Sequence, residues 1–311
     1  MPDTHAQRDA AFVAAELIAV IVAVTEGQPR VLTIEDGGAL PSGPFEFGHR
    51  SLQAGLRSWV ERQTHHPLGY VEQLYTFADR DRTDSVAERV VSVSYLGLTR
   101  EARVAREPGV GWQSWYRYFP WEDCRGDAAT LAGEGLVPRL NAWAAAGAGR
   151  DAAAKRERRH RVAVNFGQDG QRWNEELVLQ RYELLWEAGL VAESGAAAVA
   201  PGQPMAHDHR RILATGIARL RAKIKYRPVV FELMPPAFTL LQLQRAVEAL
   251  AGRLLHKQNF RRLIDQQDLV EETGEMATET GGRPAKLFRF RREILAERAV
   301  IGSKLPLVRA V

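Results

Sequence analysis

The sequence has one cysteine, Cys124, in 311 residues, and its longest apolar stretch, residues 10–24, is interrupted by Glu16. A single thiol excludes an intrachain disulfide and a cysteine-based zinc site, and it is typical of a reducing compartment. The apolar stretch is too short to cross a bilayer and lacks the features of an export signal. We therefore expect a cytoplasmic protein that makes no membrane contact.

The length suffices for two domains with a core each. The net charge is only +4, but residues 205–311 carry 20 Lys and Arg against 11 Asp and Glu, whereas residues 1–204 carry 22 against 27. A basic C-terminal third on an acidic body favours a nucleic-acid-binding module joined to a second unit. Because basic surfaces are common, the charge alone does not decide the function.

The N-terminal part predicts a mixed α/β domain. β-branched and aromatic residues indicate strands at 17–24, 30–34, 69–77 and 89–98, the first two joined by a Glu-Gly turn. An amphipathic helix is expected over residues 52–63, with Ser51 as its N-cap. The aromatic stretch 111–123 predicts a strand that enters a turn.

The composition changes between about residues 126 and 204. Alanine- and glycine-rich runs there predict loops around a strand, "RVAVNF" at 161–166, and a helix from about 174 to 188. The basic run "KRERRH" at 155–160 has three interpretations: it extends a DNA contact, covers a ligand site, or is the solvated end of a helix. No further role is indicated for this segment.

The segment "GPFEFGHRSLQAGLRSWVERQT" resembles the box of the Nudix family, in which helix carboxylates bind divalent cations and so activate water against a phosphoanhydride. Gly43, Arg57 and Glu61 match the box, whereas His49, Ser58 and Arg62 stand at glutamate positions and Thr64 at a glycine position. One carboxylate beside an arginine is a poor site for a dication that needs several oxygen ligands. We therefore expect no hydrolysis, no catalytic residue and no bound metal.

"YVEQLYTFADRDR", "VVSVSYLGL" and "YFPWED" extend the resemblance to ADP-ribose-type Nudix domains and to Nudix-related transcriptional regulators of NAD metabolism. Among these, the NadQ-type repressors, relatives of the NrtR-type regulators, share the long segment after "YFPWED". The resemblance implies no cofactor but an adenine-nucleotide effector: ATP, NAD or ADP-ribose. The candidate effector-binding residues are Arg30, Arg57, Glu61, Arg80, Arg82 and Tyr75, with Tyr70, Trp112 and Trp115 as further aromatic candidates for stacking on adenine. The alternatives are an intrahelical Arg57–Glu61 ion pair and core packing of the aromatic residues.

The C-terminal part predicts a helix, a turn, a second helix and a β-hairpin. Thr239 begins the first helix and Gly252 ends it. The second helix, from about 256 to 266, is expected to bury Phe260, Leu263 and Ile264. Before them, "RPVVFELMPPAF" predicts a strand and a Pro-Pro hinge. "FTLLQLQRAVEALAGRLLHKQNFRRLI" followed by "GGRPAKLFRF" closely resembles the winged helix of the Nudix-related regulators.

A helix of this kind can enter a major groove, where arginine reads guanine and asparagine or glutamine reads adenine. The candidate DNA-binding residues are Thr239, Lys257, Gln258, Asn259, Arg261, Arg262, Thr280, Gly282, Arg283 and Lys286. The alternative is a winged helix used for protein contacts.

These observations predict an α+β protein. We expect a Nudix-like α/β/α sandwich over residues 1–230, with an insertion at about 126–204, and a winged helix-turn-helix over 231–311. The favoured function is a homodimeric repressor of NAD biosynthesis genes that binds palindromic operator DNA and releases it when the body binds an adenine nucleotide. Two alternatives are a Nudix hydrolase with an accessory DNA-binding domain and an RNA-binding or scaffold protein.

Overall fold

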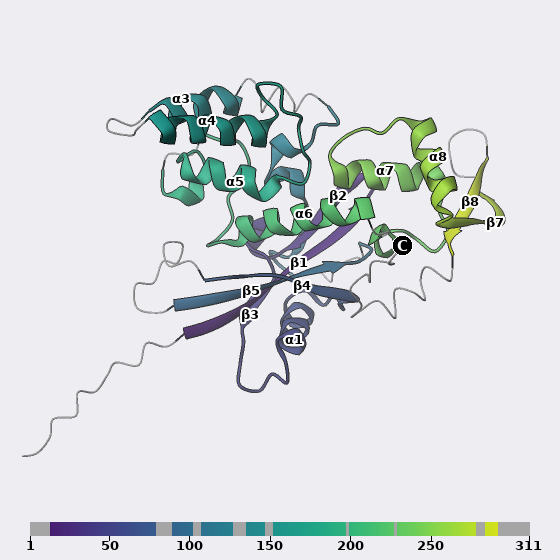
Figure 1. Cartoon of the computed structure of the whole chain (residues 1–311). Coiled ribbons are helices and arrows are strands. Elements are labelled where there is room, and N and C mark those ends of the chain that lie inside the picture. Colours follow the sequence, from purple (N-terminus) through teal and green to yellow (C-terminus); the bar gives the residue numbers. More distant parts are fainter. Residues whose placement is uncertain are drawn as a thin grey trace, which may run out of the picture.

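The computed structural model describes residues 13–78, 89–101, 107–126, 135–146, 152–196, 199–226, 229–277 and 284–291. These residues form a mixed β-sheet with helices on both faces, a group of helices stacked beyond one face, and a smaller unit of helices and a β-hairpin at the C-terminal end (Figure 1). The arrangement agrees with the predicted α+β class and with the predicted order of a sandwich followed by a winged helix.

The sheet begins with the predicted hairpin. β1 (Val13–Thr25) and β2 (Gln28–Thr33) pair in antiparallel fashion, and the turn residues Glu26 and Gly27 have φ angles of 52° and 69°. Two consecutive positive φ angles are the signature of a type I′ turn, whose twist matches that of the flanking strands. A glycine at the second position meets this requirement without steric cost.

The strand order is β4-β5-β1-β2-β6, and β3 also pairs with β1. The other strands are β3 (Ser42–Pro44), β4 (Tyr70–Phe77), β5 (Arg89–Leu98) and β6 (Gly111–Ser114). β5 runs parallel to β1, whereas the remaining pairs are antiparallel. Residues 17–23 of the central strand β1 are almost fully buried, because both faces of the sheet are covered there.

Alternate residues of β1 pack against different helices. The odd-numbered residues from 17 to 21 share a core with Leu56 and Val60 of α1 (Leu52–Thr64). The even-numbered residues from 18 to 22 belong to a larger core with α6 (His209–Tyr226), which crosses the opposite face (Figure 1). Ser51 caps α1 as predicted, since its side chain accepts a hydrogen bond from the amide of Ala54 at 3.1 Å.

Three helices lie in the segment predicted to be an insertion: α3 (Val137–Ala145), α4 (Ala152–Phe166) and α5 (Val178–Glu187). The predicted strand at residues 161–166 is wrong, because these residues end α4. Val162, Ala163 and Phe166 are buried, and this spacing is that of one helix face. The alanine- and arginine-rich residues 152–160 are helical rather than a loop, in keeping with the high helix propensity of both residue types.

Short 3-10 turns connect several elements: η1 (Glu35–Gly37), η3 (Trp115–Arg117), η4 (Pro120–Glu122), η6 (Ala192–Ser194) and η7 (Val229–Leu233). η7 replaces the strand predicted from "RPVVFELMPPAF". Val230, Phe231 and Leu233 in this turn are buried, so the apolar run packs into the core without pairing as a strand.

The centre of the molecule contains a buried ionic cluster, which we call the Glu122 network and define as Glu122, Arg181 and Arg221. All three side chains are 0% exposed. Arg181 of α5 donates to both carboxylate oxygens of Glu122, at 2.6 and 2.8 Å, and Arg221 of α6 donates to Oε2 at 2.6 Å. Burial alone would raise the pKa of the Glu122 carboxyl, but the two arginines hold it below its ordinary value.

Backbone carbonyls accept several of the remaining guanidinium hydrogens of the network. Arg181 Nη1 donates to Asn165 O and Asn174 O, at 2.9 and 3.0 Å, and its guanidinium lies over the Trp173 ring. Such saturation is required of a buried charge, because each unpaired polar group in a dry interior destabilises the fold.

We expect Glu122→Gln to lower the free energy of unfolding by about 3–5 kcal/mol, because it removes the carboxylate that faces two buried arginines. The stability that this carboxylate provides is present above its unfolded-state pKa and is lost as pH falls through its lowered folded-state pKa. Urea unfolding at neutral pH measures the change. Glu271→Gln is the control, since its ion pair with Arg289 is solvent-exposed and we expect a change below about 1 kcal/mol. Equal effects of the two substitutions would contradict this role.

Candidate nucleic-acid interface

The first helix of the C-terminal unit, α7 (Leu240–Ala251), has the predicted boundaries. Thr239 accepts a hydrogen bond from the amide of Gln242, and the Gln242 side chain accepts one from the amide of Thr239, so the two residues form a capping box. Gly252 ends the helix with a φ angle of 70°. Thr239 is buried, so its side chain serves the start of α7 in this structure.

The second helix, α8 (Lys257–Gln267), is anchored by Phe260 and Ile264, which are buried four residues apart. Leu263, which was predicted to be buried, is 49% exposed. The exposed polar residues on this helix include five of the predicted DNA-binding residues: Lys257, Gln258, Asn259, Arg261 and Arg262.

A two-stranded hairpin and a backbone bridge complete this unit. β7 (Val270–Ala277) and β8 (Ala285–Phe290) form the predicted hairpin. Phe238, just before α7, forms an isolated β-bridge with Phe288 through two backbone hydrogen bonds, of 2.9 and 2.8 Å. The rings of Phe231, Phe238 and Phe290 pack together behind it. A helix-turn-helix followed by a hairpin that is bridged to the residues before its first helix is a winged helix.

The cations of α8 differ from those of the hairpin. Lys286 binds Glu272 at 2.8 Å, and Arg289 binds Glu271 at 2.7 Å. No ion pair among the described residues involves Lys257, Arg261 or Arg262. The positive charge of α8 is therefore available to an external anion, whereas that of the hairpin strands is partly neutralised. Thr280, Gly282 and Arg283 lie outside the described residues.

The helix that resembles the Nudix box uses its altered positions for contacts within the protein. His49 accepts a hydrogen bond from the amide of Glu46 at 3.0 Å. Arg62 lies 4.5 Å from the centroid of the Trp59 ring and donates to Ser58 at 3.4 Å. Among the described residues, no cluster of three or more His, Cys, Asp and Glu side chains is arranged to hold a metal ion.

Tight packing fastens this helix to β3. The Trp59 indole donates to Pro44 O at 2.9 Å, and a Cβ atom at Gly43 would lie 2.3 Å from the indole ring. Gln63 exchanges two hydrogen bonds with the backbone of Ser42, at 3.1 and 2.8 Å. The glycine that matches the Nudix box is therefore required here for close packing.

The predicted Arg57–Glu61 ion pair does not form. Arg57 instead donates to the carbonyls of Leu68 and Gly69, the second at 2.8 Å, and Glu61 is exposed. Arg57 thereby ties the end of α1 to the start of β4.

The predicted effector residues are only partly brought together. Arg30 pairs with Ala23 across the hairpin, which places its side chain on the α1 face of the sheet, and its Nη1 donates to Trp112 O at 3.5 Å. Tyr75 is 59% exposed on β4, and two strands separate it from Arg30. Trp115 is fully buried in the core. Arg80 and Arg82 lie outside the described residues.

Two buried donors on the α1 face have no acceptor in the described part of the chain: Nε of Arg30 and Nε1 of Trp112. Trp112 pairs with Leu32, a member of the α1-side core, so both donors lie on one face of neighbouring strands. The edge of the His66 ring meets the Trp112 ring.

The described helices include none that is long and apolar enough to cross a membrane.

Comparison with known proteins agrees with this architecture. Residues 230–290 match the family model described as the NrtR DNA-binding winged helix domain. A stretch of 86 residues, 28% of the chain, is 42% identical to the "ADPR responsive transcriptional repressor NtrR" of Acinetobacter baylyi. The chain matches only 34% of the length of that relative.

Solved structures extend the similarity to most of the chain. NrtR of Shewanella oneidensis, in complex with a 27mer DNA, superposes with a TM-score of 0.55 over 91% of this chain and 95% of that chain, at 19% identity. A MutT/nudix family protein from Enterococcus faecalis gives 0.54 over 94% and 89%, at 16% identity. The predicted fold, a Nudix-like body followed by a winged helix, is thus confirmed, as is the resemblance to Nudix-related regulators of the NrtR type.

We expect Arg261→Ala to weaken binding to a specific duplex by about 1–3 kcal/mol, because we expect this exposed arginine of α8 to contact a base or a phosphate. If the partner is a phosphate, the slope of log K against log salt also falls by about one. Fluorescence anisotropy at several salt concentrations measures both quantities. Arg139→Ala on the exposed face of α3 is the control. Unchanged affinity of the Arg261 variant would exclude α8 as the recognition helix.

Proposed function

We propose that this protein is a transcriptional repressor whose winged helix binds operator DNA and whose Nudix-like body lowers operator affinity when it binds ADP-ribose. The observation that carries the proposal is the pairing of a winged helix that has unpaired cations on α8 with a body whose metal-binding positions hold His49, Ser58 and Arg62. The name of the Acinetobacter baylyi relative and the DNA complex of Shewanella oneidensis NrtR support the two halves of this proposal.

We assign effector binding to residues 1–230 and DNA binding to residues 231–311. Lys257, Gln258, Asn259, Arg261 and Arg262 contact the major groove, while Lys286 and the residues Thr280, Gly282 and Arg283 contact the flanking backbone. Thr239 acts at the start of α7, a position suited to a phosphate. A single winged helix covers little DNA, so a homodimer on a palindrome is the expected binding unit.

The effector site lies on the α1 face. The unpaired donors of Arg30 and Trp112 suit the acceptor oxygens of a diphosphate or ribose, and Arg57 and Glu61 of α1 are further candidates. Tyr75, whose ring meets Phe77 on β4, is a candidate for stacking on adenine at the edge of the sheet. Arg80 and Arg82 precede β5 in the sequence and are further candidates for phosphate contact. ATP and NAD share the adenosine diphosphate part and are the competing effectors.

No hydrolysis accompanies binding. A dication that activates water in a Nudix site needs several carboxylate oxygens, and the positions of three glutamates are occupied here by an imidazole, a hydroxyl and a guanidinium. The regulated genes are those of NAD biosynthesis, in accordance with the resemblance to regulators of NAD metabolism.

We expect the protein to bind promoter DNA of NAD biosynthesis genes and so to retard it in a gel. We expect ADP-ribose to release this DNA from the protein, because the body binds the nucleotide better in the conformation that fits DNA less well. Electrophoretic shifts with and without ADP-ribose, ATP and NAD measure site, effector and direction together. Rapid turnover of ADP-ribose in the presence of Mg²⁺ would contradict the proposal and favour a hydrolase. Equal affinity for every duplex sequence would contradict the proposed function as a sequence-specific repressor.

A further inference from the structure

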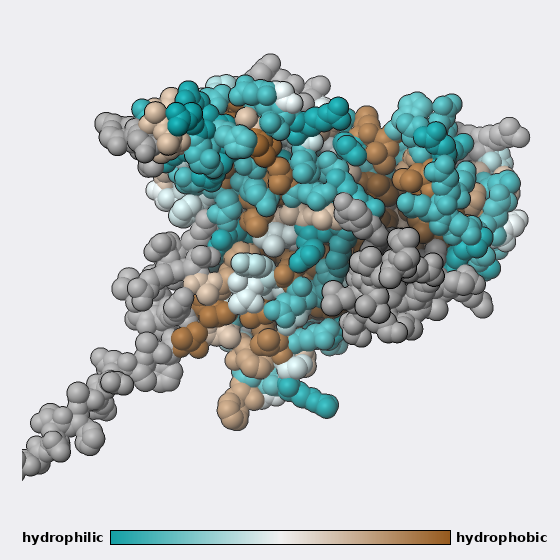
Figure 2. Space-filling model, in the orientation of Figure 1, coloured by the Kyte–Doolittle hydropathy of each residue, from teal (hydrophilic) through white to brown (hydrophobic). Residues whose placement is uncertain are grey.

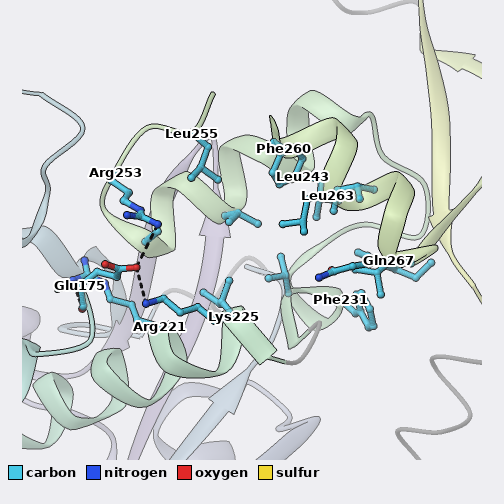
Figure 3. A pocket seen from close by; sticks show the side chains of 17 residues that line it. Glu175, Arg221, Lys225, Phe231, Leu243, Arg253, Leu255, Phe260, Leu263 and Gln267 are labelled. Atoms are coloured by element: carbon cyan, nitrogen blue, oxygen red, sulfur yellow. Dashed lines mark hydrogen bonds and ion pairs between the residues drawn. The ribbon is translucent and has the colours of Figure 1, made fainter. Parts of the chain in front are cut away.

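The helical segment α3–α5 contacts the junction between α6 and α7 through two sets of ion pairs. The inner set is the Glu122 network, to which α5 contributes Arg181. The outer set is centred on Glu175, just before α5, whose carboxylate lies 3.0 Å from Lys225 of α6 and 3.5 Å from Arg253 of the α7–α8 turn. Figure 3 shows Glu175 between these two cations.

The C-terminal end of α7 is held against the body. Arg221 Nε donates to Leu250 O at 2.9 Å, and the Tyr116 hydroxyl donates to Ala249 O at 2.6 Å. Gly252 has no space for a side chain, because a Cβ atom there would lie 2.3 Å from Glu122 O. The point at which the chain leaves α7 toward α8 is therefore immobilised on the body.

The recognition helix itself is less firmly supported. A cavity of about 210 Å³ lies between α6, α7 and α8. Its walls are mainly apolar and include Leu243, Phe260, Leu263, Ile264 and Phe290, and Glu175, Lys225 and Arg253 line its polar end. Figure 2 shows this hydrophobic hollow where the winged helix meets the body. The cavity leaves part of the inner side of α8 without packing contacts, whereas the end of α7 is hydrogen-bonded to the body.

We propose that the α3–α5 segment is a brace that sets the orientation of the recognition helix, and that Glu175 and Arg253 are its positioning residues. Arg253 is the residue after Gly252, at the start of the turn into α8, so a fixed Arg253 limits the tilt of α8 into the cavity. Glu175 is 8% exposed and its position follows that of α5, which the Glu122 network joins to the body. The brace also transmits a conformational change of the body on nucleotide binding to α8. This transmission rests on the proposed function, whereas the brace itself does not.

Substitutions that change the charges of the outer ion pairs test the brace. Arg253→Glu places two carboxylates together, Glu175→Gln with Arg253→Glu removes this repulsion without placing a further cation against Lys225, and Arg139→Glu makes the same charge change on the exposed face of α3. Arg253 is more than half exposed, so its single variant is expected to fold, and Glu175→Gln keeps the size of a side chain that is 8% exposed. Hydrogen–deuterium exchange of the whole chain in the absence of DNA measures the opening of residues 253–267. We expect exchange there to rise about two- to fivefold in Arg253→Glu and to return to the wild-type rate in the double variant.

Operator binding supplies the second measurement. ADP-ribose should change the operator Kd of Arg253→Glu by a factor two to five times smaller than that of the wild type, with recovery in the double variant. Wild-type exchange rates in Arg253→Glu, or failure of the double variant to restore them, would overturn the brace. If the wild-type protein itself ignores ADP-ribose, the proposed function fails, and the exchange measurement still decides whether the brace exists.

Discussion

One buried carboxylate holds three parts of this protein together. Glu122 ends the last 3-10 turn of the sheet region, Arg181 belongs to the added helices, and Arg221 belongs to the long helix that leads to the winged helix. A charge without solvent exposure is stable only when its partners remain in place. The position of α7 is therefore coupled to that of η4 and α5, because Arg221 also binds a carbonyl at the end of α7.

Side chains of α1 and of the loop before it also make structural contacts. Residues at the positions of metal-binding glutamates fasten the helix and its preceding loop: His49 closes the loop, and Arg62 covers Trp59. In the Nudix box this helix carries carboxylates that bind a cation, whereas here the same positions make contacts within the protein. The two unpaired donors of Arg30 and Trp112 remain on this face, where an uncharged or anionic acceptor suits them better than a metal.

Much of the fold was predictable from local patterns. Alternating β-branched residues marked the hairpin, and the Ser51 and Thr239 caps marked the starts of α1 and α7, because these signals depend on the nearest neighbours alone. The strand predicted at 161–166 failed since Val162 and Phe166 fit a helix face as well as a strand. Leu263 looked like core by spacing, yet it borders a cavity and is half exposed, which only the tertiary packing decides.

The residues that join the parts were missed for a related reason. Arg181 and Arg221 look like ordinary surface cations, although each occurs beside buried positions of its helix, Tyr182 and Leu220. An arginine within an apolar helix face is the signal that was available, but its partner Glu122 is 59 residues from Arg181 and 99 from Arg221. The candidate DNA contacts on α8 were easier to identify, since they lie within one helix. Which of them read bases depends on a duplex that the sequence does not contain.

We expect nucleotide binding to the body and DNA binding to the winged helix to be thermodynamically coupled through the junction between α6 and α7. Calorimetric titration of ADP-ribose into the free protein and into the protein saturated with operator tests this coupling directly. Linkage requires ADP-ribose to bind the DNA complex more weakly, by the same factor by which it weakens operator binding. Identical ADP-ribose affinities for the free and the DNA-bound protein would contradict this coupling.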